Sequence, residues 1–223
     1  MIDLPKAPHK KLSADQQAAW DKLIILLSEI SEADKKYDAL PRSDGGKIIS
    51  SDIARHLDAQ YAKAPKGVLR DLTPSWDLAW RYAQDRLERE IRKRGKRKTL
   101  RFMAGGWAAG KTHAVRHEPT TPPDLVWDGT LKEFDWAVRM VDLALKQGWK
   151  IEIVYVYRDI ELAFYGAMQR AKKEGRAVPL AELPSSHRAA QQSALKLNDL
   201  YLFEKSVTFL RLHNLGTVDV PIT

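Results

Sequence analysis

The sequence predicts an α/β fold in which helices cover both faces of a parallel sheet. From residue 99 onward, strand and helix patterns alternate, which is the order that parallel strands with crossover helices require. Residues 150–157 form an apolar run rich in isoleucine and valine, which is typical of a strand buried on both faces. A glycine-rich loop at 105–112 follows the strand expected at 99–103, and such strand-to-helix loops are frequent in this fold class.

Length and composition favour one globular domain with a small appended piece. The chain has 223 residues, of which 44% are hydrophobic and 30% charged, and a chain of this length can bury a core. The absence of cysteine excludes disulfides, thiol catalysis and cysteine-zinc sites. It also favours the cytoplasm, either of the producing cell or of a cell into which the protein is delivered. No run of about 18 apolar residues occurs, so no membrane contact is predicted.

A helical extension is predicted for residues 1–45, ahead of an α/β domain at 46–223. Ser13 and Gln16 have the spacing of a capping box, which marks the start of a helix. The helix is expected to run to about residue 35, because apolar residues recur at steps of three and four: Trp20, Leu23, Leu27 and Ile30.

Residues 48–55 look like the end of a strand that turns into a helix. Two isoleucines lead into serines and then into Asp52 and Arg55. Asp52 either caps this helix or binds substrate together with Arg55. A further helix is predicted from Thr73 and Pro74 to Gly95, because threonine is a good cap and proline fits the first helical position.

Residues 105–112 match the phosphate-loop pattern G-x-x-x-x-G-K-[ST] at every fixed position. Glycines let the backbone turn its N–H groups toward a phosphate chain, Lys111 adds a charge and the Thr112 hydroxyl can hold Mg²⁺. A helix is expected to follow the loop, and Trp107 either stacks on a base or shields the loop. The predicted nucleotide contacts are Gly105, Gly106, Trp107, Ala108, Ala109, Gly110, Lys111, Thr112 and His113.

Polar side chains follow two further strands where each strand ends. Asp128 and Thr130 come after the apolar residues 125–127, and Arg158 comes after 150–157. Ligands of α/β sheets bind at these carboxyl ends, so Thr130 and Arg158 are predicted to contact substrate. Asp128 has three candidate roles: a general base, a Mg²⁺ ligand or a helix cap.

Residues 169–176 concentrate positive charge after a helix predicted at 160–173. Arg170 and Arg176 either form a lid that stabilises a transferring phosphoryl group or are the solvated end of a helix. Another helix is predicted over about 186–204 and a last strand at 206–212.

The remaining excess charge lies mainly at residues 92–101 and contributes to a net charge of +8. A basic run of this kind is found in nucleic-acid-binding proteins, and it equally suits a site for a doubly phosphorylated small molecule. It is also typical of a solvated helix C-terminus, where cations are favoured, and we prefer this last interpretation.

Taken together, these segments resemble the zeta-toxin family of phosphate-loop kinases. The resemblance rests on residues 104–112, 127–131 and 150–159 and on Arg170 and Arg176. It implies a P-loop kinase-like sheet, ATP and Mg²⁺ as cofactors, and phosphorylation of a sugar or ribose hydroxyl in UDP-N-acetylglucosamine, NAD or a similar nucleotide-linked metabolite. It also implies a toxin or effector, whose partner would be a small antitoxin protein.

The chain departs from the family in the order of its segments. The family places an acid-bearing strand after the phosphate loop, whereas the similar segment of this chain, residues 49–55, precedes it. Asp52 and Asp128 therefore compete for the role of base, and we predict that Asp128 is the base and Asp52 a substrate contact. Two other functions stay open, namely a polynucleotide kinase and a nucleotide-binding module without catalysis.

Overall fold

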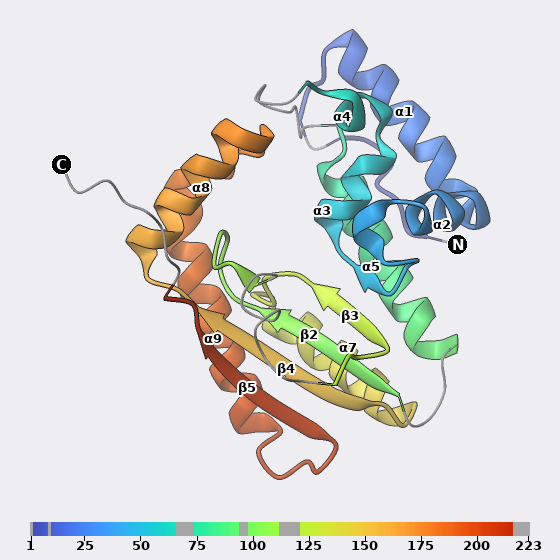
Figure 1. Ribbon diagram of the computed structural model, residues 1–223. Helices are drawn as coiled ribbons and strands as arrows, with labels where there is room; N and C mark the ends of the chain where they lie inside the picture. The colour runs from blue at the N-terminus through green and yellow to red at the C-terminus, as the bar shows by residue number, and fades with distance from the viewer. Residues whose placement is uncertain (1, 9, 66–73, 94–97, 112–120, 216–223) are drawn as a thin grey trace, which may run out of the picture.

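The computed structural model describes residues 2–8, 10–65, 74–93, 98–111 and 121–215. Its centre is a five-stranded parallel sheet in the order β1-β3-β2-β4-β5 (Figure 1), so the predicted α/β class is confirmed. The strands are β1 (Ile48–Ile49), β2 (Thr99–Ala104), β3 (Leu125–Asp128), β4 (Lys150–Tyr157) and β5 (Val207–His213).

Helices precede and connect these strands. Within the described residues, no helix is long and apolar enough to cross a lipid bilayer. The α-helices are α1 (Ala14–Ser28), α2 (Ile30–Asp38), α3 (Ser51–Ala54), α4 (Ala59–Lys63), α5 (Trp76–Lys93), α7 (Phe134–Lys146), α8 (Ile160–Glu174) and α9 (Leu183–Leu200). Short 3-10 turns lie at η1 (Pro41–Ser43), η2 (Arg55–Leu57) and η3 (Leu180–Glu182).

Strand β1 joins the sheet beside a strand that comes much later in the chain. Ile48 and Ile49 pair in parallel with Val126 and Trp127 of β3. The segment that precedes the phosphate loop therefore extends the sheet beyond β3. The residues after β1 consequently lie at the same carboxyl edge as the residues that follow β2, β3 and β4.

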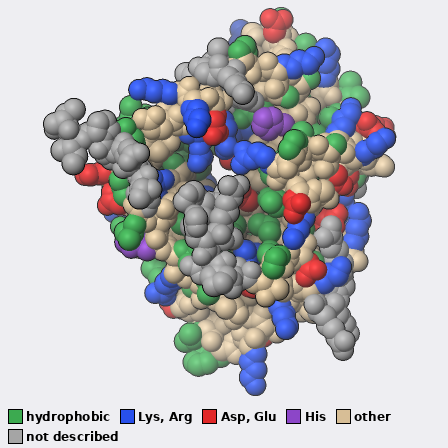
Figure 2. Space-filling view, viewed as in Figure 1, with side chains coloured by type: hydrophobic (Ala, Val, Ile, Leu, Met, Phe, Trp, Pro, Cys, Tyr) green, Lys and Arg blue, Asp and Glu red, His purple; other side chains and the backbone are tan. Residues whose placement is uncertain are grey.

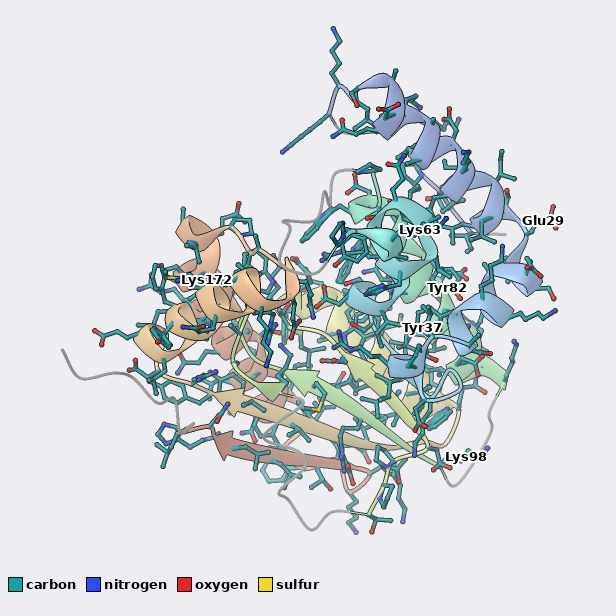
Figure 3. All side chains as sticks on the ribbon, turned by 45° about the horizontal axis from the view of Figure 1, so that its top comes forward. Glu29, Tyr37, Lys63, Tyr82, Lys98 and Lys172 are labelled. Atoms are coloured by element: carbon teal, nitrogen blue, oxygen red, sulfur yellow. The ribbon has the colours of Figure 1, made fainter. Side chains whose placement is uncertain are left out.

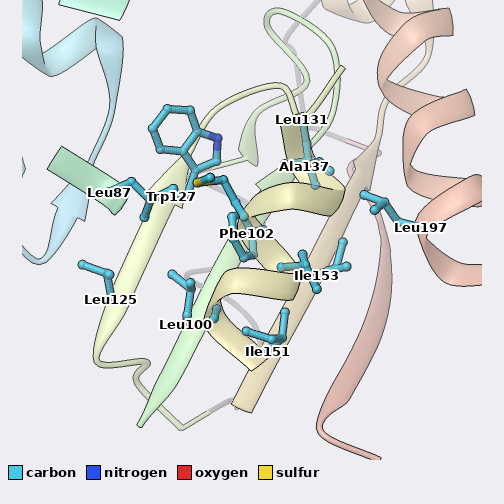
Figure 4. Packing of buried hydrophobic residues seen from close by; sticks show 14 of the residues in the cluster. Leu87, Leu100, Phe102, Leu125, Trp127, Leu131, Ala137, Ile151, Ile153 and Leu197 are labelled. Atoms are coloured by element: carbon cyan, nitrogen blue, oxygen red, sulfur yellow. The ribbon is translucent and has the colours of Figure 1, made fainter. Parts of the chain in front are cut away.

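The larger core lies between one face of the sheet and helices α5, α7 and α9 (Figure 4). Phe102, Trp127 and Ile153 point from three strands into this layer, and each is at most 1% exposed. The other face carries a smaller apolar group that includes Met103 and Val154. The short helix expected to follow the phosphate loop falls almost entirely on residues 112–120, which lie outside the described residues.

The N-terminal region forms a second apolar cluster that also includes the start of α5. The capping box of Ser13 and Gln16 is present, but the single helix predicted there is interrupted at Glu29. Tyr37 and Tyr82 lie close together in this region (Figure 3), with ring centroids 5.6 Å apart. The domain boundary at residue 45 stays a prediction.

Tyr37 connects this cluster to the sheet edge. Its hydroxyl donates to the Ile48 carbonyl oxygen at 3.0 Å and accepts from the Ser50 backbone N–H at 2.9 Å. Since Tyr37 is fully buried, these two bonds fix the backbone where β1 ends. The N-terminal helices thereby position the residues that follow β1.

Several element boundaries differ from the prediction by a few residues. Helix α9 begins at Leu183 rather than 186, because Pro184 fits the first turn of a helix. It ends at Leu200 rather than 204. Helix α5 begins at Trp76, and its expected cap Thr73 lies outside the described residues.

Candidate functional site

A cleft of about 560 Å³ lies at the carboxyl edge of the sheet. Its walls come from the turn between β1 and α3, the phosphate loop, the end of β3, the starts of α5 and α7, and the segment after α8. Figure 2 shows a hollow near the centre of the view with lysine and arginine side chains around it. In Figure 1, α8 lies on one side of this edge and α3 and α4 lie on the other.

The phosphate loop has the strained backbone that its glycines predict. Gly105 has φ 140° and Gly110 has φ 76°, and Ala108 also has a positive φ of 56°. The Gly105 N–H donates to the carbonyl oxygen of Thr130 at 3.1 Å, so the loop is tied to the end of β3. A non-glycine residue with positive φ has a strained backbone, and it keeps this conformation only when the surrounding structure stabilises it.

Three side chains hold the loop by its carbonyl oxygens. Arg158 Nη1 donates to Ala108 at 3.1 Å and Asn214 Nδ2 donates to Ala109 at 2.8 Å. His187 Nε2 lies 2.8 Å from the Trp107 carbonyl oxygen, so this nitrogen carries the proton. The substrate contact of Arg158 stays a prediction, and within the described residues its guanidinium group binds the loop. The sequence did not single out Asn214 or assign this role to His187, because each lies far from the loop along the chain.

Lys111 lies half-buried in the cleft. Its Nζ donates to the carbonyl oxygens of Gly105 and Gly106 at 3.1 and 3.3 Å. Burial lowers the pKa of Lys111, and the nearby carboxylates of Asp128 and Asp52 oppose this shift. The predicted contacts of Thr112 and His113 lie outside the described residues.

Asp52 and Asp128 both line the cleft, and neither is a helix cap. Ser50 caps α3 instead, because its side chain accepts the Asp52 backbone N–H at 3.2 Å. Asp128 ends β3, well before α7 begins. Asp159, directly before α8, is a helix cap, because its side chain accepts the backbone N–H groups of Glu161 and Leu162.

Asp52 is held between two arginines. Its carboxylate is 2.9 Å from Arg55 Nη1 and also forms an ion pair with Arg176, which is remote in sequence. Burial alone would raise the pKa of Asp52, but the guanidinium groups of Arg176 and Arg55 lower it to about 2. Asp52 is therefore a carboxylate at any physiological pH.

The pKa of Asp128 is shifted in the opposite direction from that of Asp52. Burial raises the pKa of Asp128, the charge of Lys111 opposes the shift, and the negative charge of Asp52 adds to it. A carboxyl group with a raised pKa is a better proton acceptor near neutral pH. Of Asp52 and Asp128, Asp128 is thus the stronger base.

The basic segment after α8 reaches the same cleft. Gly175 ends α8 in the left-handed conformation, and both Arg170 and Arg176 line the cavity. Burial and the neighbouring Arg176 lower the pKa of Arg170. Burial would also lower the pKa of Arg176, but Asp52 outweighs it and raises this pKa. Arg170 and Arg176 therefore share the cleft with Asp52, Asp128 and Lys111.

Replacing Gly105 by alanine is expected to weaken binding of a non-hydrolysable ATP analogue at least tenfold. The added Cβ would lie 2.6 Å from the Val156 carbonyl oxygen, which is backbone and cannot give way. Positive φ at alanine adds strain of about 1–3 kcal/mol. Titration calorimetry measures the effect. Gly45→Ala is the control, because Gly45 also has positive φ but has no atom within 4 Å of its added Cβ. Equal binding by Gly105→Ala and wild type would contradict a role of this backbone in phosphate binding.

Part of the chain is similar to a known protein family. Residues 122–214 match the model of the Zeta toxin family, which is a family of P-loop kinases that use ATP. The matched segment contains Asp128, Thr130, Arg170 and Arg176, whereas Lys111 and Asp52 precede it. A search among curated proteins finds no match to the chain.

Proposed function

We propose that the chain is an ATP-dependent phosphotransferase that acts on a sugar or ribose hydroxyl of a nucleotide-linked metabolite. The observation that carries the proposal is the convergence of Lys111, Asp128, Asp52, Arg170 and Arg176 in one cleft. The candidate acceptors are UDP-N-acetylglucosamine and NAD. The biological role we propose is that of a toxin or effector in the cytoplasm, restrained by a small antitoxin protein.

In this proposal the phosphate loop binds ATP. Backbone N–H groups contact the phosphates and Lys111 turns from its own loop carbonyls toward the γ-phosphate. Mg²⁺, when bound, would be held by the Thr112 hydroxyl and, through water, by Asp128, and it would neutralise charge on the β- and γ-phosphates. The carboxylate of Asp128 suits a hard cation of this kind.

Asp128 accepts the proton of the acceptor hydroxyl as the reaction proceeds. The hydroxyl oxygen forms a bond to the γ-phosphorus, the bond from that phosphorus to the β–γ bridging oxygen breaks, and ADP leaves. The raised pKa of Asp128 supports this assignment over Asp52, whose pKa is about 2. Asp52 and Arg55 then bind the acceptor.

The arginines after α8 stabilise charge on the transferring group. Such arginines lower the barrier because negative charge is spread over the phosphoryl oxygens in the transition state. Arg176 is paired with Asp52 in the ligand-free cleft. Binding of ATP therefore requires Arg176 to exchange that carboxylate, at least in part, for phosphate oxygens.

Incubation with ATP, Mg²⁺ and a pooled metabolite extract is the direct test. We expect mass spectrometry to find a nucleotide-linked metabolite heavier by one phosphate, and the purified compound to be a substrate. Separate reactions with UDP-N-acetylglucosamine and NAD assign the acceptor. ATP binding without phosphorylation of any metabolite would contradict the proposal. Phosphorylation of oligonucleotide ends, with binding that weakens steeply with salt, would favour a polynucleotide kinase.

A further inference from the structure

The cleft has an aromatic wall, defined here as Trp76, Trp80 and Trp136. Trp76 and Trp80 lie four residues apart on α5, and Gln84 follows after another four, so all three are on one face of the helix. Trp136 comes from the first turn of α7. Trp76 is 42% exposed although its side chain is large and apolar. A side chain of that kind at the mouth of a cleft is a candidate ligand contact.

The wall is rigid at its base. The rings of Trp80 and Trp136 have centroids 6.2 Å apart, and both pack against Trp127 at 6.0 and 4.8 Å. Trp127 is only 1% exposed and belongs to the core. The two partly exposed rings are therefore held in place by the core, which lowers the entropic cost of binding against them.

The wall adjoins the acceptor side of the cleft. The guanidinium carbon of Arg55 lies 4.4 Å from the centroid of the Trp76 ring, and Arg55 pairs with Asp52 at 2.9 Å. Arg55 thus connects the aromatic wall to Asp52, the carboxylate that we propose binds the acceptor. Trp76, Trp80 and Gln84 precede the segment that matches the family model, whereas Trp136 lies within it.

We infer that the aromatic wall binds a planar aromatic ring of the acceptor, such as a nucleobase or a pyridine ring. Planar rings stack on tryptophan in offset or edge-on arrangements, and every base has a face that can stack. The Gln84 side chain, which also lines the cleft, offers two donors and one acceptor to the ring edge. The inference rests on the proposed function, and it specifies that the ring of the acceptor, beyond its sugar, selects the substrate.

Quenching of tryptophan fluorescence tests the inference without catalysis. Uridine monophosphate, nicotinamide mononucleotide and ribose 5-phosphate are titrated into protein saturated with a non-hydrolysable ATP analogue. Ribose 5-phosphate has the sugar and the phosphate but lacks the ring. We expect at least one mononucleotide to bind more than tenfold tighter than ribose 5-phosphate. Trp76→Ala and Trp80→Ala should each reduce this preference about tenfold, and the milder Trp76→Phe should retain most of it.

Phe203→Ala is the matched control, because Phe203 is an aromatic side chain that is 92% exposed and outside the cleft. It should bind all three probes as the wild type does. Equal affinity for ribose 5-phosphate and both mononucleotides would overturn the inference, as would an unchanged preference in Trp76→Ala and Trp80→Ala. Failure of the ATP analogue to bind would instead overturn the proposed function. The same titrations on the free protein would then still decide whether the wall binds a ring.

Discussion

Replacing Lys111 by alanine is expected to lower kcat for phosphate transfer by about a thousandfold or more. Charges aimed at a transferring phosphoryl group are typically responsible for effects of this size. The fold should be unaffected, because within the described part of the chain the Lys111 side chain donates to carbonyl oxygens of its own loop. Initial rates with saturating ATP and the identified acceptor measure the change.

Lys205→Ala removes an equal charge from an exposed position in the turn before β5 and is expected to leave the rate unchanged. Circular dichroism and thermal melting of both variants check the fold. A biological effect that persists in Lys111→Ala, with no phosphate transfer, would assign the protein to the non-catalytic nucleotide-binding modules.

Replacing Asp128 by asparagine is expected to lower kcat by about a thousandfold with a small change in KM. Asparagine has nearly the same shape but cannot accept the proton, and general base catalysis typically contributes about 10²- to 10⁴-fold. Asp52→Asn should mainly raise KM for the acceptor, because it weakens the ion pairs with Arg55 and Arg176. Steady-state kinetics of both variants separate the two roles.

The pH profile gives an independent test of the same assignment. Burial raises the pKa of Asp128, so the acidic limb of kcat/KM should lie above the ordinary carboxyl value of about 3.9. The negative charge of Asp52 contributes to that elevation, and its removal in Asp52→Asn should shift the limb to lower pH. Asp199→Asn, at an exposed site near the end of α9, should leave the limb in place. Loss of activity in Asp52→Asn together with full activity in Asp128→Asn would make Asp52 the base.

The sequence predicted the sheet well because its strands have strong local signals. The apolar run at 150–157 and the short strand at 125–127 appear at nearly the expected residues. Strand β1 was harder to place, because two residues carry no periodicity and their partner Val126 lies far along the chain. The break at Glu29 was missed for a similar reason, since the apolar spacing continues across it to Ile30.

The site could be predicted where a motif or a strand end marked it. Lys111 was selected from a motif, Asp128 from a strand end, and Arg170 and Arg176 from a local concentration of charge; all four line one cleft. The ion pair of Asp52 with Arg176 depends on tertiary structure across 124 residues of sequence, which no local pattern contains. The contacts of His187 and Asn214 with the loop have the same origin.

Helix α5 belongs to both apolar clusters, and this has a consequence for how the protein unfolds. Leu78 and Tyr82 pack in the N-terminal cluster, whereas Leu87 and Ile91 pack against the sheet. If the N-terminal cluster unfolded while α5 stayed helical, the apolar residues in one half of α5 would be exposed to water. The acceptor side and the donor side of the cleft should therefore melt in a single cooperative transition, and amides along the whole of α5 should exchange with solvent at similar rates.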